Sequence, residues 1–276
     1  MNISIIGLGL MGGSLALNLK KIYPNWTILG YDHNKEHTTK AIELNLVDKI
    51  ANSWDEVKKS DIIILAIPVE AIIKSLQNLK DITLNTTIID LGSTKEKIVK
   101  NTPKNIRKNL IAAHPMTGTE NTGPTAAFDG LYDDKVVVLC DLEDSGELQK
   151  KIAIDIFTKL NMKIFYMNSS AHDYHAAYIS HLPHALSFSL ANAVLNQEDP
   201  KSILAMAGGG FSSMTRIAKS SPVMWSDIFK QNKTNLLKSL KSFNHEVKLM
   251  QNMIEENRWD ELEEWMKSAN LLHGII

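Results

Sequence analysis

Cysteine is almost absent from the sequence, with Cys140 as the only one among 276 residues. A single thiol excludes an intramolecular disulfide and a cysteine-rich metal site, and it favours a reducing compartment. No apolar run approaches the roughly 18 residues of a membrane-spanning helix. The first residues also lack the basic segment that opens a signal peptide. We therefore expect a cytoplasmic protein without a membrane partner.

Neither sign of charge dominates, because 30 Lys and Arg residues face 31 Asp and Glu residues, a formal net charge of −1. This balance argues against a nucleic-acid partner held by bulk charge. Apolar residues make up 44% and charged residues 22% of the chain. Both values are near those of globular proteins, so the composition excludes a disordered chain.

Short β-branched apolar segments alternate with helical patterns up to about residue 168. The expected strands are Asn2–Ile6, Trp26–Tyr31, Ile62–Ile67, Thr87–Leu91, Leu110–Ala113, Lys135–Leu139 and Lys163–Met167. The expected helices are Gly12–Ile22, Lys35–Leu44, Val69–Asn78, Lys95–Lys100 and Glu147–Leu160. This alternation predicts an α/β fold with a doubly wound, mainly parallel sheet of the Rossmann type.

Strand patterns end near Ser169, and only helical patterns follow. The expected helices are Ala171–Leu195, Pro200–Ala207, Met224–Met253 and Trp259–Leu272, with a break at Gly208-Gly209-Gly210. Breaks are also expected at Asp199-Pro200 and Ser221-Pro222. The sequence therefore predicts a dinucleotide-binding domain at 1–168 and an all-helical domain at 169–276. Long helices with an apolar face also favour a homodimer through the second domain.

A G-x-G-x-x-G run, Gly7-Leu8-Gly9-Leu10-Met11-Gly12, follows the first strand and opens the first helix. In this context Gly7 permits the tight turn, Gly9 the approach of a pyrophosphate and Gly12 close helix–strand packing. Asp32 ends the second strand, where a carboxylate accepts hydrogen bonds from the ribose of NAD and repels the extra phosphate of NADP. Lys35 nearby weakens that preference. The alternative is a glycine turn without a cofactor.

Ala66, Ile67 and Pro68 end another predicted strand. At the switch point of a doubly wound sheet, such a strand end lines the cofactor site. The alternative for Pro68 is an ordinary strand-ending proline.

Ser93 and His114 each follow a predicted strand, in the runs DLGSTK and HPMTGTE. Ligands bind at such strand ends in open α/β sheets. A histidine there, with a pKa near neutrality, can take a proton from an alcohol as hydride leaves. The alternatives are a helix N-cap for Ser93 and a structural histidine for His114.

Four histidines, His172, His175, His181 and His184, lie on the first helix of the C-terminal part. Their spacing allows a metal site, but no cysteine or carboxylate cluster completes one, so we expect no metal. Pro183 should kink this helix and could aim His184 into the cleft.

Arg216 follows the triple glycine and suits bidentate binding of a carboxylate, the alternative being an ordinary surface arginine. Trp225 follows nine residues later, and a tryptophan in such a helix is more often core than site.

Taken together, these runs resemble the prephenate dehydrogenase family, NAD-dependent enzymes of tyrosine biosynthesis. The matching runs are GLGLMGGSLA, YD, DLGSTK, HPMTGTE, HDYHAAYISHLPHA and GGGF…TRIAKSSPVMW, in the family's order over about residues 1–230.

The resemblance implies oxidative decarboxylation of prephenate to 4-hydroxyphenylpyruvate with NAD. By similarity, His114 accepts the proton of the ring hydroxyl, and Ser93 positions that hydroxyl, the nicotinamide and His114. Arg216 is similar to the arginine that binds a substrate carboxylate, and His184 to the residue near the pyruvyl side chain. Thr119 and Trp225 are counted with the substrate-binding residues.

One departure from the family pattern is Ser212-Ser213, where many members carry a basic residue and an acid. It leaves arogenate, the aminated analogue, open as the preferred substrate. Two further alternatives are a β-hydroxyacid dehydrogenase and a non-catalytic NAD-binding module. The first would use a catalytic lysine, for which Lys233-Thr234-Asn235 is a poor match, and the second would need none of Ser93, His114 and Arg216.

Overall fold

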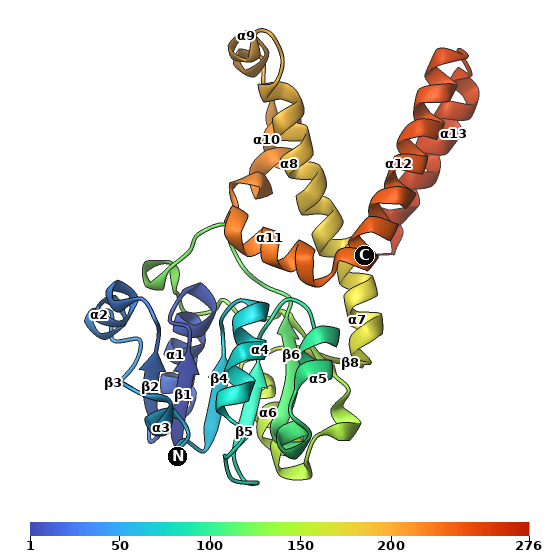
Figure 1. Ribbon diagram of the computed structural model, residues 1–276. Coiled ribbons are helices and arrows are strands. Elements are labelled where there is room, and N and C mark those ends of the chain that lie inside the picture. The colour runs from blue at the N-terminus through green and yellow to red at the C-terminus, as the bar shows by residue number, and fades with distance from the viewer. Residues whose placement is uncertain (276) are drawn as a thin grey trace. The chain divides into compact units, whose positions relative to one another are not determined.

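One eight-stranded sheet organises the N-terminal part of the protein in the computed structural model, which describes residues 1–275 (Figure 1). The strands are β1 (Asn2–Ile6), β2 (Thr27–Tyr31), β3 (Lys49–Ile50), β4 (Ile62–Leu65), β5 (Thr87–Asp90), β6 (Leu110–Pro115), β7 (Val136–Cys140) and β8 (Lys163–Met167). Their order across the sheet is β3-β2-β1-β4-β5-β6-β7-β8. All neighbours pair parallel except β6 and β7, which are antiparallel. The predicted Rossmann-type, mainly parallel sheet is confirmed.

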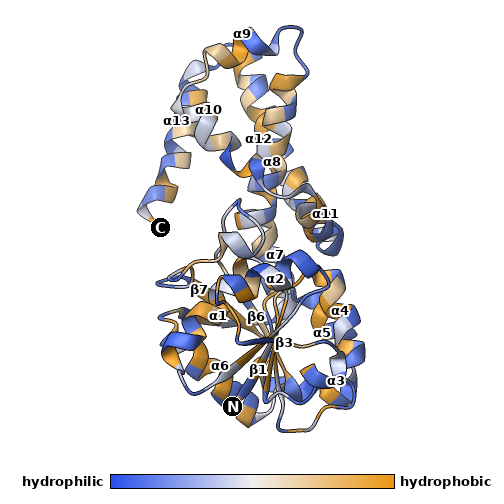
Figure 2. Ribbon diagram, turned by 90° about the vertical axis from the view of Figure 1, so that its left-hand side faces the viewer, coloured by the Kyte–Doolittle hydropathy of each residue, from blue (hydrophilic) through white to orange (hydrophobic). Residues whose placement is uncertain are grey.

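Helices cover both faces of this sheet, and its strands carry apolar side chains on both faces. The helices are α1 (Leu10–Ile22), α2 (Lys35–Glu43), α3 (Trp54–Val57), α4 (Val69–Asn78), α5 (Glu96–Asn101) and α6 (Glu147–Lys159). Because side chains alternate along a strand, Ile3 and Ile5 pack into one core cluster, and Ile6 packs into the cluster on the other face. Figure 2 shows the apolar strands between α1 and α6 on one side and α3, α4 and α5 on the other.

The sequence patterns missed β3 and α3. Each has four residues or fewer, which is too short for a strand or helix period to show. The other elements agree with the expected ranges to within about two residues at each end.

The chain after residue 168 is helical throughout the described part, as predicted. The helices are α7 (Ser169–Ala176), α8 (Leu182–Leu195), α9 (Pro200–Ala205), α10 (Gly209–Thr215), α11 (Pro222–Gln231), α12 (Lys233–Glu255) and α13 (Trp259–Asn270). A π-helical turn, Ala177–His181, joins α7 to α8, and a 3₁₀ turn, Arg216–Lys219, follows α10.

Three helical predictions need correction. The expected helix Ala171–Leu195 contains the π-helical turn just before Pro183, whose ring cannot follow a regular α-helical turn. The expected helix Met224–Met253 is interrupted at Asn232, whose buried side chain donates a hydrogen bond to the carbonyl of Asp173 at 2.6 Å. Of the three glycines where a break was expected, only Gly208 lies outside a helix, as the N-cap of α10, a helix that the patterns did not predict. The break also includes Met206 and Ala207.

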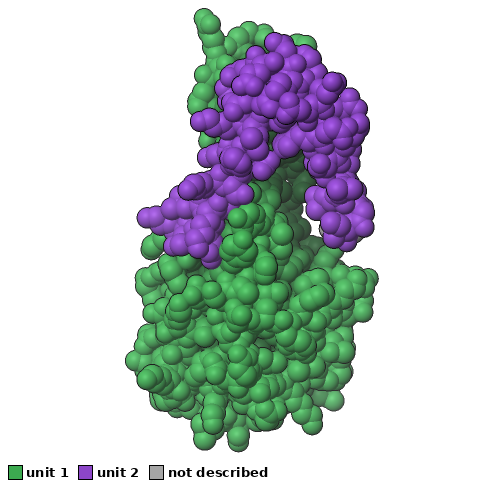
Figure 3. Space-filling view, turned by 90° about the vertical axis from the view of Figure 1, so that its right-hand side faces the viewer, with its two compact units in different colours: residues 1–232 green, residues 233–276 purple. Residues whose placement is uncertain are grey.

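The chain forms two compact units, residues 1–232 and residues 233–276, which Figure 3 draws in two colours. The first unit contains the sheet and α7 to α11, and the second contains α12 and α13. This division differs from the boundary expected at residue 168, which stays a prediction. Within residues 1–275, no helix is both long and apolar enough to cross a membrane.

Candidate active site

The turn after β1 can only be built from glycine at two positions. Gly7 has φ +92°, and a Cβ there would lie 2.3 Å from the carbonyl oxygen of Ala66. A Cβ on Gly12 would lie 1.9 Å from the carbonyl oxygen of Gly7. At Gly9, by contrast, a Cβ would meet nothing in the described residues closer than 4.0 Å. Two glycines therefore close the turn, and the third leaves space beside it.

This space lies at the start of α1, which has Gly9 as its N-cap and no side chain capping it. Uncapped N–H groups at a helix N-terminus suit phosphate oxygens. Ala66 and Ile67 also contact the turn, because the Ala66 carbonyl and the Ile67 side chain pack against Gly7. Pro68 is the N-cap of α4. The residues around the glycine turn therefore fit the pyrophosphate of a dinucleotide.

Asp32 is fixed beside the same turn. Its Oδ2 accepts the N–H of Leu8 and its Oδ1 the N–H of Asn34, both at 2.9 Å. Its side chain is only 6% exposed. His33 and His37 each place Nδ1 3.4 Å from one of its oxygens. The carboxylate is thus held at the end of β2, where a ribose bound to the turn would meet it.

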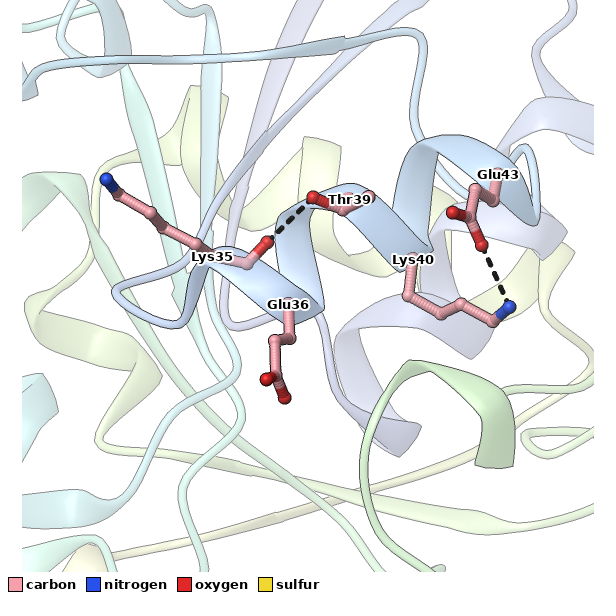
Figure 4. A pocket seen from close by; sticks show the side chains of 5 residues that line it. All are labelled: Lys35, Glu36, Thr39, Lys40 and Glu43. Atoms are coloured by element: carbon pink, nitrogen blue, oxygen red, sulfur yellow. Dashed lines mark hydrogen bonds and ion pairs between the residues drawn. The ribbon is translucent and has the colours of Figure 1, made fainter.

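Lys35 does not join Asp32. It lines a separate surface pocket, all on α2, together with Glu36, Thr39, Lys40 and Glu43 (Figure 4). The Lys40 ammonium is paired with Glu43 at 2.9 Å. The pocket contains no residue of the glycine turn, so it is distinct from the candidate dinucleotide site.

The loop after β6 contains the end of the HPMTGTE run and contacts α1 further along. The Phe128 N–H donates to the Ser14 hydroxyl at 3.0 Å, and the Tyr132 hydroxyl donates to the Met11 carbonyl at 2.8 Å. Thr119 is exposed on this loop and accepts the N–H of Asn121 at 3.2 Å. The loop that follows β6 therefore contacts the helix that begins at the glycine turn.

His114, near the end of β6, is hydrogen-bonded to a second histidine. Its Nδ1 lies 2.8 Å from Nε2 of His172, and Nδ1 of His172 lies 2.8 Å from Oδ1 of Asp173. Burial lowers the pKa of His114 well below its usual value of 6.5, and nearby His172 and Lys95 lower it further. His114 is therefore a neutral imidazole at neutral pH, which is the form that can accept a proton.

Asp173 also caps α5 from outside that helix. Its two oxygens accept the N–H groups of Lys95 at 2.7 Å and Glu96 at 3.0 Å. The N-cap position of α5 is Lys95. Ser93 is therefore not the N-cap of this helix. Ser93 is partly buried, and among the described residues its hydroxyl is not engaged in a hydrogen bond.

Behind the site lies a buried ion pair between Lys95 and Asp90, both 0% exposed. The Lys95 ammonium also donates to the carbonyl of Ala113, the residue before His114, at 2.7 Å. Burial raises the pKa of the Asp90 carboxyl, against the opposing effect of Lys95. Lys95 thus ties the loop that carries Ser93 to the strand end that carries His114.

Three of the residues expected to bind the substrate, His184, Trp225 and Arg216, form a second group. The His184 ring stacks on Trp225 with centroids 3.5 Å apart, and His184 Nδ1 lies 2.9 Å from the Ser180 carbonyl oxygen. Trp225 is buried at 6% exposure. Burial lowers the pKa of His184, and the charge of Arg216 lowers it further.

Arg216 is 62% exposed and lies 3.8 Å from Glu120 of the HPMTGTE run. Sequence reasoning assigned no role to Glu120, although it stands in a matching run. It also missed the contact of His172 with His114 and that of Asp173 with His172, for which the HD pair at 172–173 is the signal. The four histidines of α7 and α8 do not converge, because His172 contacts His114, His181 contacts Asn232 and His175 is exposed.

Within the described residues, no three His, Cys, Asp or Glu side chains gather in a way that could hold a metal ion.

Comparison with known proteins gives one consistent result over most of the chain. Residues 15–166 match the model described as the nucleotide-binding domain of prephenate dehydrogenase, and residues 168–268 match its dimerization domain. A prephenate dehydrogenase of Bacillus subtilis is 32% identical over 97% of this chain and 74% of its own length. A cyclohexadienyl dehydrogenase of Zymomonas mobilis is 32% identical over 97% of this chain and 93% of its own length.

A solved structure agrees with these matches. It is the crystal structure of a prephenate dehydrogenase from A. aeolicus in complex with hydroxyphenyl propionate and NAD⁺. The similarity has a TM-score of 0.93 at 32% identity and covers 99% of this chain and 97% of the other. The chain therefore belongs to the prephenate dehydrogenase family.

Proposed function

We propose that this protein catalyses the NAD-dependent oxidative decarboxylation of prephenate to 4-hydroxyphenylpyruvate. The observation that carries the proposal is the position of His114: a neutral, partly buried imidazole near the end of β6, before the loop that contacts the start of α1. The family membership supports the same reaction class. It speaks against a β-hydroxyacid dehydrogenase and a non-catalytic binding module.

The glycine turn and Asp32 are the residues that would hold the cofactor. The pyrophosphate would face Gly7, Leu8, Gly9, Leu10, Met11 and Gly12, and the ribose would face Asp32. The rest of the cofactor would face Ala66, Ile67, Pro68 and Ser93. Bound NAD supplies a hydride acceptor for the ring carbon. A carboxylate beside the ribose favours NAD over NADP, because it would repel the additional phosphate.

The chemistry assigned to the protein itself is proton transfer and orientation. His114 takes the proton of the ring hydroxyl as the carbon–hydrogen bond breaks, and the hydroxyl oxygen gains double-bond character. The electrons of the ring–carboxylate bond then enter the ring, which becomes aromatic, and carbon dioxide leaves. The carbonyl oxygen becomes a phenolate oxygen and takes a proton back from His114 to give the hydroxyl of the product. Ser93 would hold the ring hydroxyl toward His114.

The second group of residues would bind the charged ends of the substrate. Arg216 is the cation for a carboxylate, and His184, Thr119 and Trp225 would surround the side chain. Because Arg216 lies next to Glu120, binding of a carboxylate would exchange one anionic partner for another.

Arogenate is the second candidate substrate. Ser212 and Ser213, both exposed, provide no charge after the glycines. Arogenate carries an ammonium group on its side chain, so a missing cation costs it less binding than it costs prephenate. The similarity to a cyclohexadienyl dehydrogenase is consistent with either substrate.

The division into a dinucleotide-binding domain at 1–168 and a helical substrate-binding and dimerisation domain at 169–276 is part of this proposal. The two family models, which meet at residues 166 and 168, support it. A homodimer through the helical part is the corresponding assembly, and a cytoplasmic location stays a prediction from composition.

The test is turnover by the purified protein. NADH formation is followed with prephenate or arogenate as substrate and NAD or NADP as cofactor. We expect turnover with prephenate and NAD, and a fall in kcat of about 10²–10⁴ for His114→Asn with NAD affinity unchanged. His175→Asn, an exposed histidine on α7, is the matched control. No turnover of either substrate, or an unchanged rate in His114→Asn, would contradict the proposal.

A further inference from the structure

We propose that His172 and Asp173 are positioning residues that fix the tautomer of His114, so that its Nε2 is the atom that accepts the substrate proton. The inference rests on the proposed function and adds the identity of the basic atom and the residues that determine it. It starts from the continuous chain of hydrogen bonds from His114 through His172 to Asp173.

The direction of the hydrogen bonds follows from the acceptor at the end of the chain. The Asp173 carboxylate accepts two backbone N–H groups, from Lys95 and Glu96, and a carboxylate can only accept hydrogen bonds. Nδ1 of His172, 2.8 Å away, must then carry a hydrogen. With one proton on the ring, Nε2 of His172 is left with a lone pair.

That lone pair decides the state of His114. Nε2 of His172 lies 2.8 Å from Nδ1 of His114, so Nδ1 must be the donor of this hydrogen bond. A neutral imidazole carries one proton, and therefore Nε2 of His114 is unprotonated. The opposite tautomer would leave two lone pairs facing each other between the two rings.

The surroundings oppose a second proton on the His114 ring at rest. His172 and Asp173 are each 2% exposed. The Lys95 ammonium and His181 both lower the pKa of His114. Lys95 is itself paired with Asp90. An added proton would therefore place another positive charge beside a buried ammonium. The free Nε2 thus remains available for the substrate.

During the reaction the O–H bond of the substrate breaks, and its proton forms an N–H bond at Nε2 of His114. The electron pair of the O–H bond stays on the oxygen, which becomes a carbonyl oxygen as the hydride leaves the carbon. The Nδ1 proton stays in place and becomes a stronger donor to His172. Asp173 keeps His172 oriented and needs no proton, as in the Ser-His-Asp arrangement of hydrolases.

A purely structural role for Asp173 is the competing explanation, because this residue also caps α5 and its carbonyl oxygen accepts from Asn232. Asp173→Asn disturbs both roles, because Oδ1 accepts from the Lys95 N–H and also from His172. With its amide oxygen on the Glu96 N–H, the variant would turn its NH₂ group toward the Lys95 N–H and Nδ1 of His172, and it would donate to that nitrogen. His172 would then carry its hydrogen on Nε2 and force the wrong tautomer on His114. The histidine tautomers separate the two roles, since a purely structural change would not reverse them.

The experiment compares Asp173→Asn, His172→Phe and His172→Gln with wild type in the full-length protein. For Asp173→Asn we expect a loss in kcat of about 10²–10⁴, and for His172→Phe a loss of about 10–100-fold. KM for prephenate and the Kd of NAD should change less than about twofold, because neither residue is assigned a contact with them. His172→Gln should recover most of the rate, since its amide oxygen can accept from His114.

Asp141→Asn is the matched control. Asp141 accepts the N–H of Ser169 at 2.9 Å and so holds the start of the same helix α7, without contacting a histidine. We expect its kcat to equal that of wild type. Thermal unfolding of each variant identifies any that lose rate because they lose the fold.

The second readout is nitrogen NMR of the histidine rings, which distinguishes a protonated from an unprotonated nitrogen. We expect wild-type His114 to carry its hydrogen on Nδ1 and Asp173→Asn to carry it on Nε2. A wild-type signal with the hydrogen on Nε2 would overturn the inference. So would a normal kcat in Asp173→Asn, or a rate loss in His172→Phe that His172→Gln fails to recover. The wild-type NMR signal is read without substrate, so it tests the inference even if prephenate is not turned over.

Discussion

The His184 imidazole lies flat against the Trp225 indole, with ring centroids 3.5 Å apart and ring planes 20° apart. The contact joins α8 to α11. It covers one face of the histidine, while Nδ1 of the same ring is engaged with the Ser180 carbonyl. The orientation of His184 is therefore fixed by the protein before any substrate arrives.

Replacing the indole should weaken substrate binding. In Trp225→Leu the stacking partner is lost, and stacked aromatic pairs are worth about 0.5–1.5 kcal/mol. We expect KM for prephenate to rise about 2- to 10-fold, with a smaller change in kcat, in steady-state assays. Trp26→Leu is the control. The Trp26 ring stacks on the Tyr23 ring with centroids 3.7 Å apart, and neither residue is a proposed site residue. An equal effect of both variants would contradict a role for His184 and Trp225 in binding.

Arg216 should act on substrate affinity more than on rate. Its guanidinium is 62% exposed, and a hydrogen bond to a charged group contributes about 1.5–3 kcal/mol. We expect Arg216→Ala to raise KM for prephenate by about 10- to 100-fold, measured by initial rates over a range of prephenate concentrations. Lys219→Ala removes a positive charge from the same 3₁₀ turn and should leave KM unchanged. Saturation of Arg216→Ala at wild-type concentrations would argue against the assignment.

Asp32 should determine the preference for NAD. Asp32→Asn removes the charge that repels the NADP phosphate, and its one oxygen still accepts one of the two N–H groups, of Leu8 or Asn34, that the two oxygens of Asp32 accept. We expect the ratio of kcat/KM for NAD over NADP to fall about tenfold or more, the equivalent of about 1.4 kcal/mol. Asp61→Asn, at a carboxylate that accepts the Asn2 N–H instead, should leave the ratio unchanged. An unaltered ratio in Asp32→Asn would remove the ribose assignment.

The acid limb of the pH–rate profile should lie well below pH 6.5. Burial disfavours the charged imidazolium of His114 and so lowers its pKa from 6.5. The neutral base is therefore retained as the pH falls through 6.5, and activity is lost only when the lowered pKa is reached. The measurement is kcat/KM for prephenate against pH at constant ionic strength. A limb centred at or above 6.5 would contradict this prediction.

The buried Lys95–Asp90 pair should matter for stability. Lys95→Met leaves the Asp90 carboxyl buried without its cation, and breaking such a pair costs about 3–5 kcal/mol of unfolding free energy. The double variant Lys95→Met with Asp90→Asn should recover part of that loss, because no unpaired charge remains. Urea titration measures both. Lys40→Met, which breaks the exposed pair with Glu43, is the control and should cost less than about 1 kcal/mol.

Much of the fold follows from local sequence patterns. Asn2–Ile6, Val69–Asn78 and Lys163–Met167 were predicted to the residue, because each apolar run or helical period reports its own element. The glycine turn was equally visible, since Gly7 and Gly12 are required by backbone geometry within one short segment. At Pro183 the sequence predicts a kink in the helix. It does not predict that the irregularity is a π-helical turn before the proline.

The sequence could propose the residues of the candidate site but not the contacts between them. Spacing placed His172 and His184 on one helical segment but could not say that one contacts His114 and the other Trp225. Ser93 and His114 were proposed as site residues because each lies near the end of a predicted strand, and ligands bind at that edge of a parallel sheet.

The sequence by itself determined the strand–helix alternation, the glycine turn and the side chains available for chemistry, because these depend on contacts within a few residues. Only the tertiary structure decided that Asp173 caps α5 and orients His172, and that His172 meets His114 across 58 positions of sequence. Such pairings depend on how distant elements pack, and no local period encodes that arrangement.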